Sequence, residues 1–127
     1  MRKMFAGLAA AAFVFVLGTP TFAKTETVKG QIIDATCYKM DKTNTGVDHK
    51  MPKGDTKECA TGCAKAGRPM ALLTADGKVY ELAGGLAAEK NAKIVPHVGH
   101  TVEVTGDVTD HEGKTMITSD TLKMISK

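Results

Sequence analysis

Apolar and polar residues alternate in several short segments of this chain, a pattern typical of β-strands with one buried face. The clearest example is residues 101–107 (TVEVTGD), and residues 28–35 (VKGQIIDA) form an earlier β-rich run. Residues 70–74 (MALLT) and 78–82 (KVYEL) are separated by an Asp-Gly turn, which predicts a β-hairpin. A last strand is predicted within residues 115–125. The chain is therefore expected to be mainly β.

Two short segments have the composition of helices. Residues 59–65 follow Asp55, and Glu58 stands three residues after Asp55, the spacing of a helix-capping box. Residues 86–92 are rich in helix-forming residues. Residues 36–57 are polar and contain glycine and proline, which predicts a loop long enough to have a function.

Five strands with a helix between the third and fourth is the element order of the OB-fold, a small Greek-key barrel. Gly30 and Gly106, inside the first and fourth predicted strands, suit the sharp coiling of such a barrel. The predicted fold is mainly β with short helices: a five-stranded OB-like barrel with a helix between strands 3 and 4 and a short cysteine-bearing helix after strand 1. A small α+β sandwich is the competing fold.

The N-terminus has the three regions of a secretory signal. Arg2 and Lys3 precede an apolar stretch over residues 5–18, and small residues follow it. We therefore predict a cleavable signal peptide over residues 1–23, a single OB-like domain over residues 24–127, and a periplasmic location. The apolar stretch is shorter than the roughly 20 residues of a membrane span, so no stable membrane anchor is expected after cleavage.

Composition argues against a nucleic-acid partner. Removal of Arg2 and Lys3 with the signal lowers the formal charge from +3 to +1. All four phenylalanines lie in the signal, and there is no tryptophan, so Tyr38 and Tyr80 are the only aromatic rings of these types left for stacking on bases. The mature domain thus lacks both the positive groove and the stacking surfaces that single-stranded nucleic acid requires.

Three cysteines are the main candidates for chemistry: Cys37, Cys59 and Cys63. In an oxidising compartment one pair would form a structural disulfide and leave a free thiol. Alternatively, all three would bind a metal ion with a histidine. A dithiol redox role is a third reading. Cys59 and Cys63 share one helix face, and Cys59, near the helix N-terminus, is expected to be the more reactive thiol.

The four histidines differ in their expected roles. His49 lies in the cysteine-bearing loop and is the first candidate for a fourth ligand. His111 lies in the predicted turn between the last two strands, from which it would approach the cysteines in a barrel. His97 and His100 are most simply explained as solvent-facing loop residues.

The sequence therefore favours a non-enzymatic binding module with a soft-metal site. Met40 and Met51 flank the same loop, so copper is a candidate beside zinc, since thioether and thiolate ligands suit Cu(I). No catalytic signature is visible, and no cofactor other than zinc or copper is expected. The partner would be the metal ion or an unknown periplasmic protein. The predicted metal ligands are Cys37, Cys59, Cys63 and His49.

The chain also resembles a family of small exported bacterial proteins of uncharacterised function. The resemblance covers most of residues 24–127. It is carried by residues 30–38 (GQIIDATCY), 59–63 (CATGC), 67–69 (GRP), 72–80 (LLTADGKVY) and 102–106 (VEVTG).

In that family a histidine often stands a few residues before the Cys-Ala-x-x-Cys segment. Here the corresponding residues are 55–58 (DTKE), and the nearest preceding histidine, His49, stands ten residues before Cys59. The resemblance implies an exported small barrel and brings no established activity with it.

Overall fold

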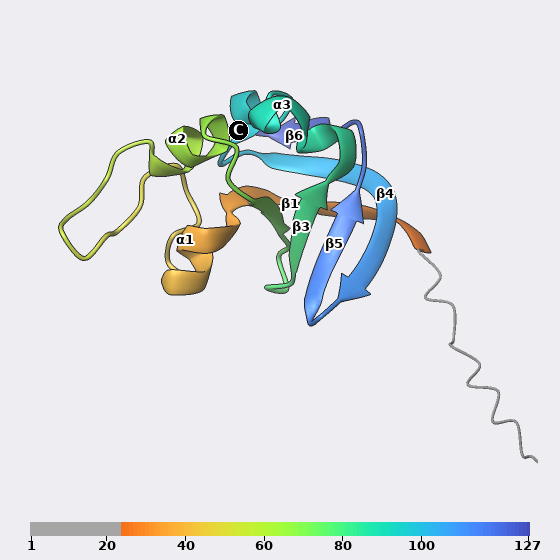
Figure 1. The fold of residues 1–127 in the computed structure, drawn as a ribbon, viewed down its shortest axis with the longest axis horizontal. Coiled ribbons are helices and arrows are strands. Elements are labelled where there is room, and N and C mark those ends of the chain that lie inside the picture. Colours follow the sequence, from red (N-terminus) through yellow and green to blue (C-terminus); the bar gives the residue numbers. More distant parts are fainter. Residues whose placement is uncertain (1–23) are drawn as a thin grey trace, which may run out of the picture.

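The structure, a computed structural model, describes residues 24–127 (Figure 1). The predicted signal peptide, residues 1–23, lies outside the described residues. No helix in the described part of the chain is long and apolar enough to cross a membrane. The strands are β1 (Lys24–Asp34), β2 (Met70–Leu73), β3 (Val79–Ala83), β4 (Thr101–His111), β5 (Lys114–Thr118) and β6 (Lys123–Ser126).

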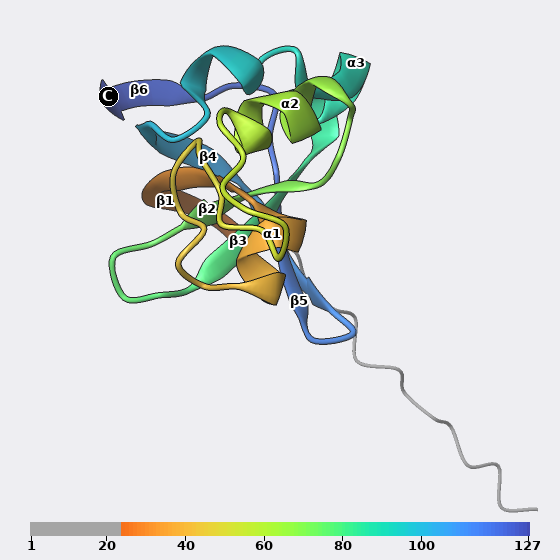
Figure 2. The same cartoon turned by 90° about the vertical axis from the view of Figure 1, so that its left-hand side faces the viewer.

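Five of these strands close into a barrel. Their order is β1-β2-β3-β5-β4, and β4 pairs back onto β1. The pairs are antiparallel except for β3 and β5, which run parallel. β6 is added beside β4. The chain is thus mainly β: a closed five-stranded mixed barrel with one extra strand and short helices (Figures 1 and 2).

Two glycines allow the strands to approach one another closely. β1 pairs with β4 over residues 24–31 and with β2 over residues 31–34. An added Cβ at Gly30, beside this change of partner, would lie 2.7 Å from the backbone oxygen of Leu73. Gly106 in β4 is crowded in the same way by the backbone of β5. No side chain fits at either position, so both glycines have the close-approach role that an internal strand glycine often marks.

Aliphatic side chains from five strands fill the centre of the fold. Fully burying one such side chain contributes about 1.5–3 kcal/mol, so this cluster is the main source of the barrel's stability. Ala60 and Ala64, on the helix α2 (Cys59–Lys65), pack into the same core. Among its fully buried members are Ile32, Leu72, Val102, Val104 and Ile117.

The polar segment 36–57 is not the continuous loop that the sequence predicts. Its start belongs to the helix α1 (Ala35–Met40), whose N-cap is Asp34. The Asp34 Oδ1 accepts hydrogen bonds from the backbone N–H groups of Thr36 at 2.9 Å and Cys37 at 3.0 Å. This cap satisfies two N–H groups that a helix start leaves unpaired, so α1 begins directly after β1.

The helix α2 is found where the sequence predicts it, but the predicted capping box is wrong. Its N-cap is Glu58, which has a φ of 50° and makes no side-chain cap. The Glu58 N–H instead donates to the Asp48 Oδ1 at 2.7 Å. Since Asp48 is ten residues away, a local spacing rule does not find this contact.

The helix predicted over residues 86–92, between β3 and β4, is found only in part. Three short elements replace it, because Glu89, Lys90 and Asn91 have φ values of 53°, 55° and 59°, which interrupt a right-handed helix. The predicted strand at 115–125 is likewise divided into β5 and β6. The short elements are η1 (Gly84–Leu86), α3 (Ala88–Asn91) and η2 (Val95–His97).

Candidate metal centre

Cys37 is placed by the junction of β1 and α1. Asp34 ends the strand and caps the helix, so Cys37 lies in the first turn of α1. Because the side chains of the preceding residues Ile32 and Ile33 are fully buried, this junction is anchored in the protein interior. Cys37 itself is 5% exposed.

Cys59 and Cys63 are placed by α2, on which they stand four residues apart and therefore share a face. The helix is fixed at both ends. Near its start, the Ala60 N–H donates to the Val47 carbonyl at 3.0 Å. Near its end, the buried Asn91 Nδ2 donates to the Ala64 carbonyl at 3.0 Å. Both cysteines are half-buried.

The three predicted thiol ligands meet at one place. The Sγ atoms of Cys37, Cys59 and Cys63 all lie within 4.8 Å of one another. No disulfide joins them, and all three are free thiols. Zinc binds thiolates at about 2.3 Å in a tetrahedron, which sets sulfurs about 3.8 Å apart. A modest inward movement of these side chains would therefore provide three of the four ligands of a tetrahedral zinc ion.

His49, the predicted fourth ligand, is 1% exposed. Its Nε2 lies 3.1 Å from the Gly46 carbonyl oxygen, and a carbonyl can only accept, so Nε2 carries the proton. In that tautomer Nδ1 bears the lone pair, and it is buried with no hydrogen-bond partner. A metal-binding histidine usually donates its other ring N–H in this way.

His49 groups with different neighbours from the other predicted ligands. Its ring nitrogen, the Cys37 Sγ and an Asp34 carboxylate oxygen lie within 4.8 Å of one another. The two groups share Cys37, while Cys59 and Cys63 are absent from the group that contains His49. The structure thus places His49 beside one of the predicted thiol ligands rather than in one compact set with all three.

Asp34 is the member of this region that the sequence analysis missed. Its side chain is fully buried, and Oδ2 has no hydrogen-bond partner while Oδ1 caps α1. A signal was present in the sequence, since an aspartate that follows an apolar strand end is a typical helix N-cap. Because residues 36–57 are predicted to form a loop, the sequence analysis does not assign this capping role to Asp34.

Asn44 was missed as well, and it fixes the loop that carries His49. The side chain is 1% exposed, and its Oδ1 accepts from the Lys50 N–H at 2.8 Å. A pair of backbone hydrogen bonds, 3.0 and 2.8 Å long, then joins His49 to Thr56 and closes the exposed tip of the loop. The inner part of the loop is therefore held between α1 and α2, on one side of the barrel (Figures 1 and 2).

The thiols of Cys37 and Cys63 are held in the protonated form. Burial, followed by the charge of Asp34, raises the pKa of Cys37 from 9.0 to about 11. Burial, followed by the adjacent Asp34 carboxylate, raises the pKa of Cys63 to about 12. Both thiols are thus neutral at pH 7, and a metal ion that binds them must displace their protons.

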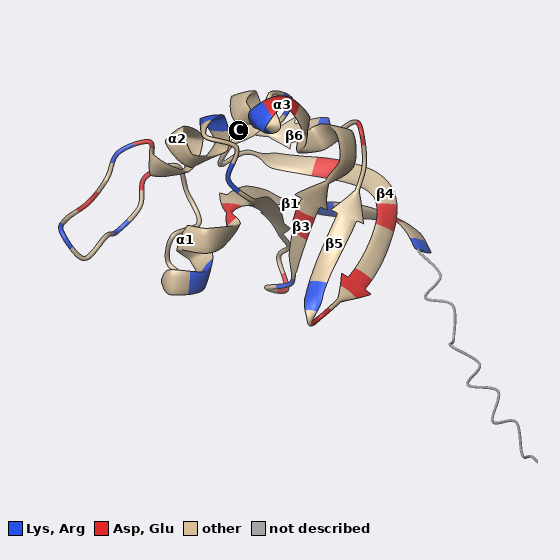
Figure 3. Ribbon diagram, in the orientation of Figure 1, with Lys and Arg blue, Asp and Glu red and all other residues tan. Residues whose placement is uncertain are grey.

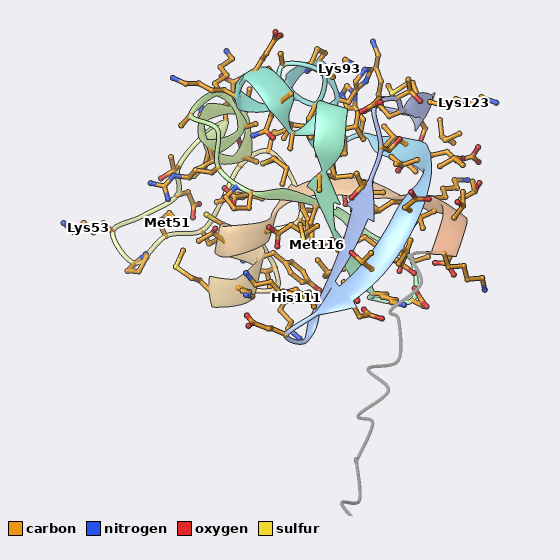
Figure 4. All side chains as sticks on the ribbon, turned by 45° about the vertical axis from the view of Figure 1, so that its right-hand side comes forward. Met51, Lys53, Lys93, His111, Met116 and Lys123 are labelled. Carbon is orange, nitrogen blue, oxygen red and sulfur yellow. The ribbon has the colours of Figure 1, made fainter. Side chains whose placement is uncertain are left out.

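The other predicted candidates lie outside both groups. His111 is on the β4–β5 hairpin, its side chain is 80% exposed, and Nε2 lies 3.9 Å from the Glu112 carboxylate (Figure 4). His97 and His100 are half-buried, with ring centroids 6.1 Å apart, and not solvent-facing as predicted. Met40, at the end of α1, is 64% exposed.

A groove of about 720 Å³ lies beside α1, where β3 and β5 face the helix. Tyr38 is the one aromatic residue that lines it, and Glu81 is the one acidic residue. Elsewhere, basic and acidic residues are both spread over the described elements (Figure 3). The four basic residues of the groove are Lys39, Lys42, Lys78 and Lys114.

Comparison of the chain with protein-family models, curated proteins and solved structures gave no match. The resemblance to small exported bacterial proteins therefore stays a prediction, and the functional argument rests on the geometry of the cysteine-bearing region.

Proposed function

We propose that this protein is an exported, non-enzymatic module that binds a soft metal ion through Cys37, Cys59 and Cys63, with His49 as the preferred fourth ligand. The observation that carries the proposal is the convergence of three thiols within 4.8 Å. A physiological partner besides the metal would be another periplasmic protein.

Two unpaired buried atoms support a metal over a simple disulfide. Buried polar groups almost always have a hydrogen-bond partner. The His49 Nδ1 and the Asp34 Oδ2 have none, and both belong to the group that shares Cys37 with the three-thiol cluster. A cation beside Cys37 would satisfy both atoms, whereas a disulfide would leave them unpaired.

The donor types restrict the choice of metal. Three thiolates with one imidazole are a standard set for structural zinc, and soft sulfur ligands also suit Cu(I). The strand order and parallel β3–β5 pair support an OB-like identity for the barrel. The presence of both basic and acidic residues throughout the described elements gives no support for the nucleic-acid role that such barrels often have.

The test begins with the full chain, including its signal, expressed for export and recovered from the periplasm. Native mass spectrometry, before and after alkylation of thiols, should find one metal ion and protection of all three cysteines. A protein lighter than its reduced form by two hydrogen atoms, with one alkylated thiol and no metal, would instead support the alternative, a disulfide-stabilised or thiol-redox interaction protein.

A pair of matched variants tests the fourth ligand. His49→Gln should weaken zinc binding by at least the roughly 10- to 100-fold that loss of a supporting partner costs. His111→Gln makes the same chemical change at an exposed site and should leave zinc affinity unchanged. Equal effects of the two substitutions would remove His49 from the ligand set.

A further inference from the structure

Asp34 places a buried carboxyl group, without an ion-pair partner among the described residues, beside the three-thiol cluster. Its carboxylate is within 4.8 Å of the Cys37 Sγ, and its side chain is fully buried. Among residues 24–127, Asp34 takes part in no ion pair with lysine, arginine or histidine. A buried charge is costly unless it is paired or coordinates a metal, so a bound cation is the natural counter-charge.

The formal charges of the centre depend on the ion that it holds. Three thiolates carry three negative charges, of which a divalent ion cancels two and Cu(I) cancels one. The Asp34 carboxylate adds a further negative charge to either complex. The more negative complex, with Cu(I), is therefore the less favourable one in this buried position.

We propose that Asp34 makes this centre select a divalent ion, such as zinc, over Cu(I). The inference rests on the proposed metal site and names the class of ion that it takes. The repulsion between Asp34 and the thiolates is the same in both complexes and cancels in the comparison. What remains is the attraction of the carboxylate for the second positive charge of the divalent ion.

The two oxygens of Asp34 allow its electrostatic effect on the metal to be separated from its capping of α1. Oδ1 caps α1 through the N–H groups of Thr36 and Cys37, while Oδ2 is unpaired. Asparagine at this position keeps an oxygen for the cap, since asparagine and aspartate are equally good N-cap residues, but it removes the charge. Asp34→Asn therefore changes the electrostatics and leaves the helix start intact.

The experiment measures zinc and Cu(I) affinities of the reduced full chain by competition with a chromophoric chelator for each metal. One unit of charge at about 5 Å and an effective dielectric constant of about 20 corresponds to a ratio of about 300-fold. The ratio of zinc to Cu(I) affinity should therefore fall about 300-fold in Asp34→Asn. Asp48→Asn, at an exposed acid that also accepts a backbone hydrogen bond, should leave the ratio unchanged.

The ratio is a readout that a purely structural role would not move. If Asp34→Asn lowers the zinc and Cu(I) affinities equally, or changes neither of them, the inference is wrong while the proposed metal site stands. If the unmodified protein binds neither metal, the proposed function and the inference fail together. Should Asp34→Asn not fold, Asp34→Ser provides a hydroxyl cap without charge and must show the same fall in the ratio.

Discussion

The affinity of this protein for zinc should rise steeply with pH, because the metal-free site holds its protons tightly. The perturbation is a change of pH between about 6.5 and 8 in reduced protein. Over this range the thiols of Cys37 and Cys63 are protonated, since their pKa values are raised to about 11 and about 12. Only the thiolate is a metal ligand, so each of these cysteines must lose its proton when zinc binds.

The magnitude follows from the number of protons released. Each proton lost on binding, well below the pKa of its group, increases the apparent affinity tenfold per pH unit. Cys37 and Cys63 together predict an increase of about 100-fold per pH unit. The sign is fixed by the direction of the shift: a raised thiol pKa favours the neutral form, so protons compete with the metal more effectively as pH falls.

Competition titrations with a chelator of known pH dependence would measure the slope. Proton release in weakly buffered solution, recorded as zinc is added, would give an independent count of at least about two protons per ion. An increase of tenfold or less per pH unit, with fewer than two protons released, would refute the reasoning. It would show that at least one of the two thiols is already ionised or is not a ligand.

The metal-free protein should lose stability as pH rises from about 9 to 11, because the raised pKa values of Cys37 and Cys63 favour their neutral forms in the folded state. Urea unfolding should show a loss of unfolding free energy that approaches about 1.4 kcal/mol per thiol per pH unit. An unfolding free energy that does not change over this pH range would contradict the prediction. Ile32→Ala should lower the free energy of unfolding by about 2–5 kcal/mol, because it leaves a cavity in the core. A loss below about 1 kcal/mol would mean that neighbouring side chains fill this cavity. Single-stranded DNA should not bind at physiological salt, since the groove beside α1 offers lysines but one aromatic ring; micromolar binding by fluorescence anisotropy that weakens steeply with salt would contradict this.

The sequence predicts the barrel well because its strands are encoded locally. Alternation over residues 101–107 and the Asp-Gly turn before β3 each depend on neighbouring residues alone. The same local signals overestimate the length of the helix predicted over residues 86–92, of which only α3 is α-helical. Its composition favours a helix, but the chain there takes positive φ at three successive residues.

The candidate site is predicted only in part, because its residues come from separate elements. The convergence of the three cysteines was expected from their scarcity and spacing, and the structure brings them together. Asp34 was overlooked because it is a helix cap only if α1 follows it, and the polar composition of residues 36–57 predicts a loop there instead. Asn44 was overlooked because its hydrogen bonds to the Cys37 and Lys50 backbones become visible only once the loop is folded.

The cysteines link two helices that lie outside the ring of strands. The strands are hydrogen-bonded to one another around the ring, whereas α1 and α2 are separated in sequence by the long loop that carries His49. A metal held by Cys37 on α1 and by Cys59 and Cys63 on α2 would join the two ends of that loop. Since the core is already buried without it, the metal would reinforce the hydrogen bonds that hold this side of the molecule rather than create the fold. That arrangement suits a module whose metal can be gained and lost while the barrel stays intact.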